Sequence, residues 1–243
     1  MIITSKSNPL IKEISKLVDK KYRKLSGDYL VEGIKPVREC ISAGCCVEKI
    51  VCVEELASQF PDAILVSRSV FESISSEKSP QGVIAVVKIP QLPLAAPENN
   101  CLLLDNLQDP GNIGTIIRTA NAAGYKELYL VNCVDPYSPK AVRASMSGIF
   151  FVNIYQGNEN EILDALSGVP LICADMDGEN IYNFVPPEKF CLCIGNEGNG
   201  ISDNLIKKAD YRISIPMEKT CESLNAGVSA GIAMYQLKFG KMR

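Results

Sequence analysis

Apolar residues follow two alternating patterns along most of the chain. Short, nearly continuous apolar runs are typical of strands buried on both faces of a sheet. Such runs occur at 101–105, 127–131, 149–155, 170–174, 190–194 and 211–215. Helical spacing of apolar residues occurs near 112–123, 138–147, 159–167, 202–208 and 224–239. This alternation predicts an α/β fold, a parallel sheet with helices on both faces, whose ligands bind at the carboxyl ends of the strands.

The first 89 residues show the same patterns in shorter elements, which predicts a small α/β domain. Helices are expected at 8–25, 34–44 and 68–76, and strands at 28–33, 47–55, 63–67 and 81–89. The stretch 90–100 contains Pro90, Pro93 and Pro97 and has no periodicity. Proline disfavours both helices and ladders, so this stretch is the expected linker. We therefore expect domains at 1–89 and 101–243.

Composition excludes several kinds of chemistry. The chain has no histidine, which rules out Ser-His-Asp and Cys-His nucleophiles. Its ten cysteines lack the spacing of a zinc site, so no metal is expected. Without a secretion signal, these cysteines indicate reduced thiols of a cytoplasmic protein. No run of 18 apolar residues occurs, so no membrane span is expected either.

Positive charge is concentrated near the N-terminus. Residues 1–28 carry seven Lys and Arg against three acidic residues, although the whole chain has a net charge of −3. The densest part of this segment holds Lys20, Lys21, Arg23 and Lys24. Such a patch is suited to phosphate groups of a nucleic acid. A solvated helix face accounts for the same pattern, and both interpretations stay open.

The helix expected at 112–123 begins in an unusual way, within "DNLQDPGNIGTIIRTANAAG" at 105–124. Gly111, Gly114, Arg118 and Asn121 share one face of it. Glycines at a helix start let an anion or another backbone approach the free N–H groups, and an arginine one turn later can bind a phosphate with two N–H groups. Close helix packing is the alternative. The pattern is neither G-x-G-x-x-G nor a Walker loop, which disfavours NAD and ATP.

Two further strand ends carry unusual residues. "CIGNEGNGIS" at 193–202 places three glycines directly after a buried strand, which indicates a loop whose backbone is open to a ligand. "ISIPMEKTCESLNAGVSAGIAMYQ" at 213–236 leads into a helix that contains Gly227 and Gly231. Each glycine inside a helix costs about 1 kcal/mol relative to alanine. We therefore expect a neighbouring helix, a cofactor or a dimer partner to pack closely there.

Together, the three segments resemble motifs 1, 2 and 3 of the SpoU (TrmH-type) branch of the SPOUT methyltransferases. They occur in that family's order and spacing over 101–239. The first domain, with "YLVEGIKPVRECISAG" and "SPQGVIAV", more loosely resembles the family's substrate-binding domain. The resemblance implies a 2′-O-ribose methyltransferase that uses S-adenosylmethionine and acts on tRNA or rRNA. It also implies a homodimer and a C-terminal trefoil knot, which general topology rules would argue against.

The resemblance also assigns residues to roles. The cofactor positions, held mainly through backbone atoms, are Ala174, Gly195, Ile215 and Leu224. The catalytic arginine corresponds to Arg118, and the polar residues around the reacting centre correspond to Asn112, Glu197, Ser223 and Asn225. With RNA as the partner, the basic patch becomes the candidate RNA-binding set Lys20, Lys21, Arg23 and Lys24.

One departure from the family pattern is "SLNAGVSAG" in place of the "SLNVSVA" of many members, which is expected to alter the packing of that helix start. Other functions stay open at this point. They are an RNA-binding protein of this fold without catalysis, a SPOUT enzyme that methylates a base nitrogen, and a small-molecule enzyme on an unrelated α/β fold.

Overall fold

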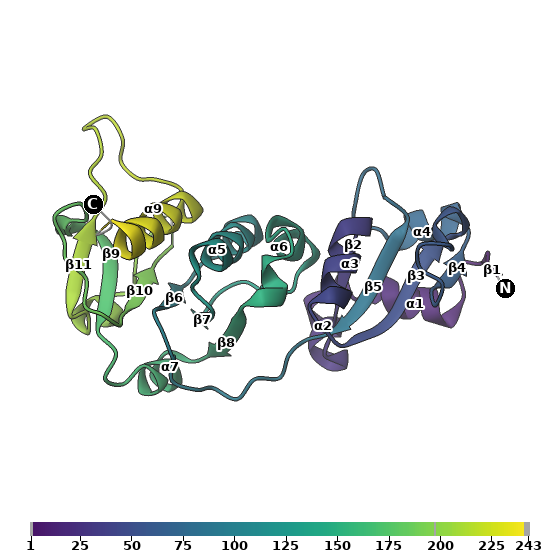
Figure 1. Ribbon diagram of the computed structural model, residues 1–243, viewed down its shortest axis with the longest axis horizontal. Coiled ribbons are helices and arrows are strands. Elements are labelled where there is room, and N and C mark those ends of the chain that lie inside the picture. The colour runs from purple at the N-terminus through teal and green to yellow at the C-terminus, as the bar shows by residue number, and fades with distance from the viewer. Residues whose placement is uncertain (1, 197, 241–243) are drawn as a thin grey trace. The chain divides into compact units, whose positions relative to one another are not determined.

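The protein is described by a computed structural model that covers residues 2–196 and 198–240 (Figure 1). Contacts within the chain define two compact units. The first unit comprises Met1–Gln91 and Asp135–Phe150, and the second comprises Leu92–Val134 and Phe151–Arg243. Residues 135–150 fall within the range expected for the second domain, yet their contacts group them with the first unit.

The first unit is built on a five-stranded mixed sheet with the order β1-β4-β3-β5-β2. Its strands are β1 (Ile2–Ile3), β2 (Asp28–Glu32), β3 (Val47–Val53), β4 (Ile64–Val66) and β5 (Val83–Lys88). Its helices are α1 (Pro9–Lys16), α2 (Lys20–Ser26), α3 (Ile34–Ser42), the 3-10 helix η1 (Glu54–Leu56), α4 (Arg68–Ile74) and α6 (Pro139–Ala144). The 3-10 turn η2 (Gly148–Phe151) follows α6. The expected strands of this unit are all present.

The expectation of one continuous helix over 8–25 is wrong, because α1 and α2 are separate helices. The side chain of Asp19 accepts a hydrogen bond from the Lys21 N–H at 2.8 Å and so starts a new helix. The change of direction exposes Leu25, which is 73% accessible although the periodicity placed it on the buried face.

The break between the helices also turns Arg23 inward, where its side chain is only 3% exposed. Its Nε and Nη2 atoms donate to Asp135 Oδ2 at 2.8 and 2.7 Å. Its Nη1 atom donates to the carbonyl oxygens of Leu17 and Val18, both at 2.7 Å. A buried ion pair therefore attaches segment 135–150 to the first unit, and the assignment of Arg23 to RNA binding is corrected.

The second unit confirms the parallel-sheet α/β architecture. All neighbouring strands run parallel, in the order β11-β9-β10-β6-β7-β8. The strands are β6 (Cys101–Asp105), β7 (Glu127–Val131), β8 (Asn153–Gly157), β9 (Leu171–Asn180), β10 (Cys191–Ile194) and β11 (Tyr211–Ser214). Strand β8 begins later than the apolar run at 149–155 because residues 148–151 form the turn η2.

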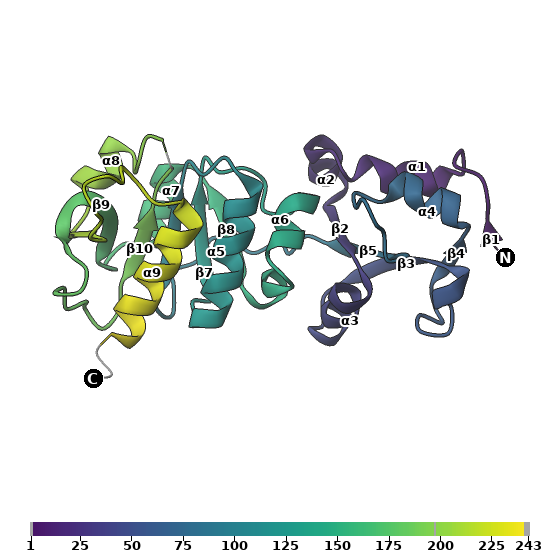
Figure 2. The same cartoon turned by 90° about the horizontal axis from the view of Figure 1, so that it is seen from above.

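Helices cover both faces of this sheet, as expected. They are α5 (Pro110–Ala123), α7 (Glu159–Ala165), α8 (Asp203–Lys207) and α9 (Ala226–Phe239). Helices α5 and α9 lie side by side on one face, as both ribbon views show (Figures 1 and 2). Within the described residues, no helix is both long and apolar enough to cross a membrane.

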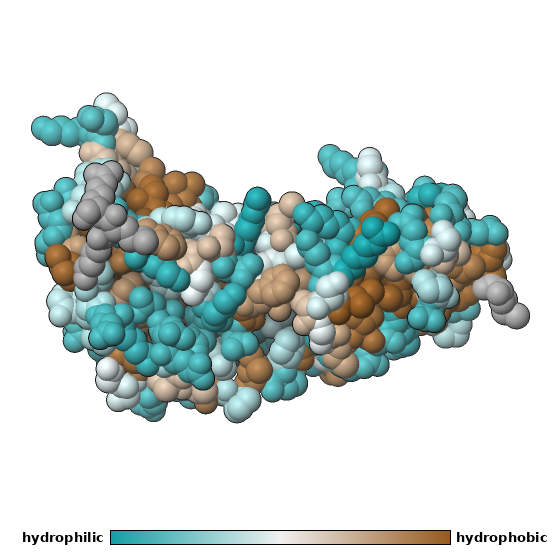
Figure 3. Space-filling model, in the orientation of Figure 1, coloured by the Kyte–Doolittle hydropathy of each residue, from teal (hydrophilic) through white to brown (hydrophobic). Residues whose placement is uncertain are grey.

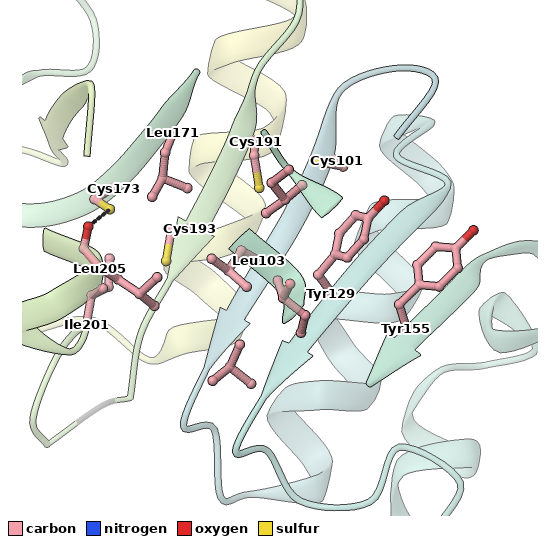
Figure 4. Packing of buried hydrophobic residues seen from close by; sticks show 13 residues of the cluster. Cys101, Leu103, Tyr129, Tyr155, Leu171, Cys173, Cys191, Cys193, Ile201 and Leu205 are labelled. Carbon is pink, nitrogen blue, oxygen red and sulfur yellow. Dashed lines mark hydrogen bonds between the residues drawn. The ribbon is translucent and has the colours of Figure 1, made fainter. Parts of the chain in front are cut away.

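The core of the second unit contains four of the cysteines (Figure 4). Across β10, Cys191 stands in register with Cys101 on one side and Cys193 with Cys173 on the other. All four are fully buried free thiols, and burial raises the pKa of Cys191 and of Cys193 above the usual range. They therefore act as small apolar side chains, as expected for reduced thiols.

The stretch 90–100 has neither helix nor strand, but its second half is bound to the second unit. The Tyr129 hydroxyl donates to the Ala95 carbonyl at 2.7 Å, and the Glu98 N–H donates to Glu127 Oε1 at 3.0 Å. These contacts fix the entry of the chain into β6.

Candidate functional site

A cavity of about 630 Å³ lies at the carboxyl ends of β10 and β11, at the sheet edge where the sequence placed the site. Its walls come from the second unit, from residues 174–177, 194–196, 198–200, 213–217 and 222–229. The four predicted cofactor positions, Ala174, Gly195, Ile215 and Leu224, all line it. Ser223, one of the expected polar residues, lines it as well.

The wall at 174–177 arises from an irregularity in β9. Cys173 pairs with Arg212 of β11, but the next pair joins Glu179 to Ile213, so the intervening residues bulge out of the ladder. Gly178 makes this possible, since a Cβ atom there would lie 2.4 Å from the Ile213 nitrogen. The bulge carries Asp175, Met176 and Asp177 to the cavity, and the sequence reasoning missed all three. The one available signal was the glycine in "ADMDGEN".

An ion pair holds the bulge in place. The Arg212 Nε atom donates to Asp175 Oδ2 at 2.7 Å, and its Nη2 atom reaches both Asp175 and Asp177. Because Arg212 stands on the neighbouring strand, the acidic wall is fixed relative to the sheet.

The loop after β10 is held by its own backbone and by Asn196. Asn196 and Gly200 exchange two backbone hydrogen bonds of 2.9 Å. The Asn196 side chain accepts from the Gly198 N–H at 2.8 Å and donates to the Asn106 carbonyl at 3.0 Å. Gly195 is required for a close approach, because a Cβ atom there would lie 2.3 Å from the Gly200 carbonyl carbon. Glu197 lies outside the described residues.

The start of α9 joins the first and third motifs. Asn225 accepts from the Val228 N–H at 3.3 Å and donates from Nδ2 to Asn112 Oδ1 at 2.9 Å. The structure thus brings together Asn112 and Asn225, next to the lining residue Leu224. Arg118 is exposed on α5, beyond Asn112 along the helix, and is not among the lining residues.

A neighbouring helix explains Gly227 of α9, whereas at Gly231 a Cβ atom would make only an ordinary van der Waals contact. A Cβ atom on Gly227 would lie 3.1 Å from Thr115 Cγ2 of α5, and one on Gly231 would lie 3.6 Å from Thr119 Cγ2. The Ala226-Gly227 departure from the family pattern is therefore a close α5–α9 contact that leaves Asn225 free to cap the helix and bind Asn112.

The charged side chains that line the cavity are of one sign. The charged residues among its described lining residues are Asp175, Asp177 and Glu222, all acidic. Apolar contact surface comes from side chains such as Ile194, Met176 and Met217. A ligand with net positive charge and a flat apolar part fits this combination. The volume of the cavity lies within the usual range of small-molecule sites. Within the described residues, no group of three or more His, Cys, Asp or Glu side chains could hold a metal ion.

The candidate RNA-binding residues divide in two. Lys20, Lys21 and Lys24 are exposed on α2, whereas Arg23 is the buried ion-pair partner of Asp135.

Both units of the chain are similar to known proteins in sequence and in structure. Residues 99–235 match the SpoU rRNA Methylase family, and residues 8–85 match the MRM3-like substrate binding domain. The chain is 32% identical to the 23S rRNA (guanosine(2553)-2'-O)-methyltransferase RlmP of Bacillus subtilis, over 97% of this chain and 98% of that protein. It is 28% identical to the 23S rRNA (uridine(2479)-2'-O)-methyltransferase of Streptomyces viridochromogenes, over 88% and 83%. A solved structure, the AdoMet-bound rRNA methyltransferase from Sinorhizobium meliloti, superposes with a TM-score of 0.89 at 29% identity, covering 98% of this chain and 97% of that one.

Proposed function

The chain belongs to the SpoU rRNA methylase family, and from this premise we propose that it transfers a methyl group from S-adenosylmethionine to a ribose 2′-hydroxyl of rRNA. The names of two relatives specify different nucleosides, guanosine and uridine, but the same acceptor, the 2′-oxygen. A shared acceptor with a variable base favours ribose over a base nitrogen. Both names also specify rRNA, which favours rRNA over tRNA.

The observation that carries the proposal is the acidic cavity at the carboxyl ends of β10 and β11. Its residues fit the donor, because S-adenosylmethionine combines a sulfonium and an ammonium group with one carboxylate and a flat adenine. When bound, it supplies an electrophilic methyl group. Asp175, Asp177 and Glu222 outnumber Arg212, which pairs with the two aspartates, so the cavity keeps the matching net negative charge. Backbone groups around Gly195, Ile215 and Leu224 would hold the donor through contacts that few side-chain substitutions can remove.

Arg118 is proposed as an electrostatic clamp for the RNA. A guanidinium has a pKa above about 12, so a neutral arginine at pH 7 would cost roughly 7 kcal/mol, which makes it a poor general base. As a cation it can bind the substrate phosphate with two N–H groups and stabilise negative charge that develops on the 2′-oxygen. The proton of the hydroxyl then leaves late, to a phosphate oxygen, to water or to Glu197. Positioning of the hydroxyl can contribute roughly 7–11 kcal/mol.

The bond between Asn112 and Asn225 supports this division of roles. It ties the start of α5, which carries Arg118, to the start of α9, which follows the cavity wall at Leu224. The clamp and the donor cavity are therefore held by two helices that are hydrogen-bonded to each other.

A homodimer is part of the proposal, and its contact surface would be α9. Val228, Tyr235 and Phe239 are 49%, 46% and 39% exposed at spacings of seven and four residues, so they share one face of the helix. Apolar side chains gather at the surface over α9 (Figure 3). Because apolar helix faces are usually buried, we expect a partner to cover this exposed face of α9. Sedimentation of Tyr235→Lys tests this, since the dimer should dissociate. The trefoil knot remains a proposal that rests on the family resemblance, and the cytoplasmic location remains one that rests on the ten cysteines.

The decisive experiment combines labelled donor, the protein and 23S rRNA that lacks the modification, followed by nucleoside analysis. The expected product is a 2′-O-methyl nucleoside. A base-methylated product would replace the proposal by the base-nitrogen alternative, and absence of donor binding would favour an RNA-binding protein without catalysis. At saturating rRNA, Arg118→Lys should keep measurable activity that Arg118→Ala loses. Complete loss in both variants would contradict the clamp.

A further inference from the structure

A second cavity lies wholly within the first unit and shares no lining residue with the proposed donor cavity. Its volume of about 340 Å³ lies within the range of small-molecule sites. It is walled by the end of β2, the start of α3, the loop after α4, and α6 with the turn that follows it. Apolar side chains that supply flat or flexible contact surface are Leu30, Pro36, Val142, Met146 and Phe150.

Ser147 is the unusual polar residue of this cavity. It lines the cavity and is only 5% exposed, yet its hydroxyl has no hydrogen-bond partner among the residues that the structure describes. By contrast, the neighbouring Ser145 hydroxyl donates to the Val142 carbonyl at 2.6 Å. Among the described residues, the fully enclosed polar side-chain atoms without a partner are Asp28 Oδ1, Glu127 Oε2 and Ser202 Oγ. The Ser147 hydroxyl oxygen is instead open to the cavity, where it can donate to or accept from a ligand group.

The backbone at this position is also unfavourable. Met146 and Ser147 are consecutive residues with φ values of 45° and 66°, in the left-handed region that L residues other than asparagine and aspartate seldom adopt. The turn is fixed from both sides, because the N–H of Gly148 donates to the Ser145 carbonyl at 2.8 Å and Asp135 holds the segment to Arg23. Such outliers occur where function requires a particular placement of a side chain.

Charge narrows the class of ligand. Three carboxylates, those of Glu32, Glu39 and Glu77, line the cavity against the two cations Lys35 and Arg143. This balance disfavours a phosphate inside. Carboxylates and a hydroxyl can instead accept N–H groups from the edge of a nucleobase. Lys35 pairs with Glu39 at 3.7 Å and Arg143 pairs with Glu77 at 2.6 Å. Both cations are also exposed, so they can contact the phosphates on either side of such a base as well.

We propose that this cavity receives one unstacked base of the rRNA substrate, with the Ser147 hydroxyl as a hydrogen-bond partner of the base edge. This inference rests on the proposed function, because it takes rRNA as the substrate. Proteins that read RNA sequence commonly bind single bases that have left the helical stack, through stacking and edge hydrogen bonds. The cavity offers both kinds of contact in a unit that matches a substrate binding domain.

The test uses Ser147→Gly in the full chain. Glycine accepts the left-handed backbone and removes the hydroxyl, so the thermal midpoint should stay level or rise. The Kd for 23S rRNA should rise about three- to ten-fold, the equivalent of one neutral hydrogen bond, with donor binding unchanged. Asn132→Gly is the matched control, since Asn132 is also left-handed, with φ of 51°, but lies outside the cavity. An unchanged Kd in Ser147→Gly would overturn the proposal.

A second pair of variants tests the rim of the cavity. Arg143→Gln should weaken rRNA binding several-fold, whereas Arg68→Gln should not. The two arginines are 47% and 46% exposed, and both pair with a glutamate of the first unit, but only Arg143 lines this cavity. Equal effects of the two variants would count against a base site.

Ultraviolet crosslinking of wild-type protein to 23S rRNA, mapped by mass spectrometry, gives a direct readout. We expect nucleotide adducts on Met146 or Phe150, and adducts confined to other parts of the chain would contradict the site. Titration with the four nucleoside monophosphates separates free nucleotide from RNA: a free nucleotide that binds as tightly as rRNA would refute RNA as the occupant. None of these readouts requires methyl transfer. An adduct in the cavity without methylation would therefore reject the proposed function and keep this site, and methylation without an adduct would do the reverse.

Discussion

Removal of the Arg23 side chain provides a strong test of the structure, because sequence and structure assign this residue opposite roles. Arg23→Ala leaves the Asp135 carboxylate buried without its cation, although Asp135 Oδ1 keeps one bond from the Tyr137 N–H at 2.9 Å. The carbonyl oxygens of Leu17 and Val18 lose their donor as well. Breaking a buried pair by deleting one partner typically costs about 3–5 kcal/mol. That is a large share of the roughly 5–15 kcal/mol by which domains are stable.

The assay must report on the first unit alone, because the chain has two units and need not unfold in one step. Hydrogen exchange at the amides of β2 and β5, which pair with each other, gives this local readout. We expect Arg23→Ala to lower their protection by the equivalent of about 3–5 kcal/mol, while the amides of β6 and β10 keep theirs. At temperatures where the variant is folded, its affinity for rRNA should match the wild type.

A double variant separates pairing from simple truncation. Arg23→Met with Asp135→Leu removes both charges and keeps most of the volume, and such replacements of buried pairs are often neutral. The double variant should therefore recover most of the protection that Arg23→Ala loses. The reasoning fails if Arg23→Ala costs less than about 1 kcal/mol and weakens rRNA binding, because Arg23 would then be a surface contact as the charge pattern first indicated.

Three further outcomes follow from the structure. Gly195→Ala should abolish donor binding in calorimetry, because its Cβ atom would meet the Gly200 backbone, whereas Gly198→Ala should bind the donor, since the nearest atom lies 3.4 Å away. Equal binding by both would mean that the donor site lies elsewhere. Alanine replacement of the exposed lysines on α2 (Lys20, Lys21 and Lys24) should flatten the dependence of log affinity on log salt by about 0.7–0.9 for each phosphate that the protein no longer neutralises, and an unchanged slope would make them a solvated face. Burial raises the pKa of Cys133 to about 12 and raises that of Tyr129 above its usual value, so the folded state binds these protons more firmly than the unfolded state. Stability should thus be level below about pH 8 and fall as the pH rises through about 8.5 to 10, where unfolded thiols and phenols ionise; urea midpoints at pH 7 and 10 that coincide would contradict this.

The strands were predictable because a strand that is buried on both faces has a continuous run of apolar residues in the sequence. Runs such as "CLLLD" and "FCLCI" are typical of strands that solvent does not reach, and β6 and β10 lie where these runs predict. The break before α2 was not predictable in the same way. Asp19 reads as an ordinary polar residue within a helical period, and only its bond to the Lys21 N–H identifies it as a cap. Because α2 starts anew after Asp19, a different side of it faces inward than a continuous helix would present. The wrong prediction of RNA binding by Arg23 follows from the wrong prediction of one helix over 8–25.

The proposed donor site likewise has one part that the sequence predicts and one part that it does not. Its four predicted backbone positions sit in segments that are recognisable locally, by glycines and by the order of three motifs. The acidic wall depends instead on which residue of β9 pairs with which residue of β11, a relation between strands about 40 residues apart that no local pattern records. Yet this wall gives the cavity the negative charge on which its fit to a cationic donor depends. The sequence motifs therefore predict the position of the proposed donor site, and the strand register determines its electrostatic character. Asp175→Asn should for that reason weaken binding of S-adenosylmethionine more than binding of S-adenosylhomocysteine, whose thioether lacks the sulfonium charge. Equal weakening of the two in calorimetry would show that the wall acts through shape alone.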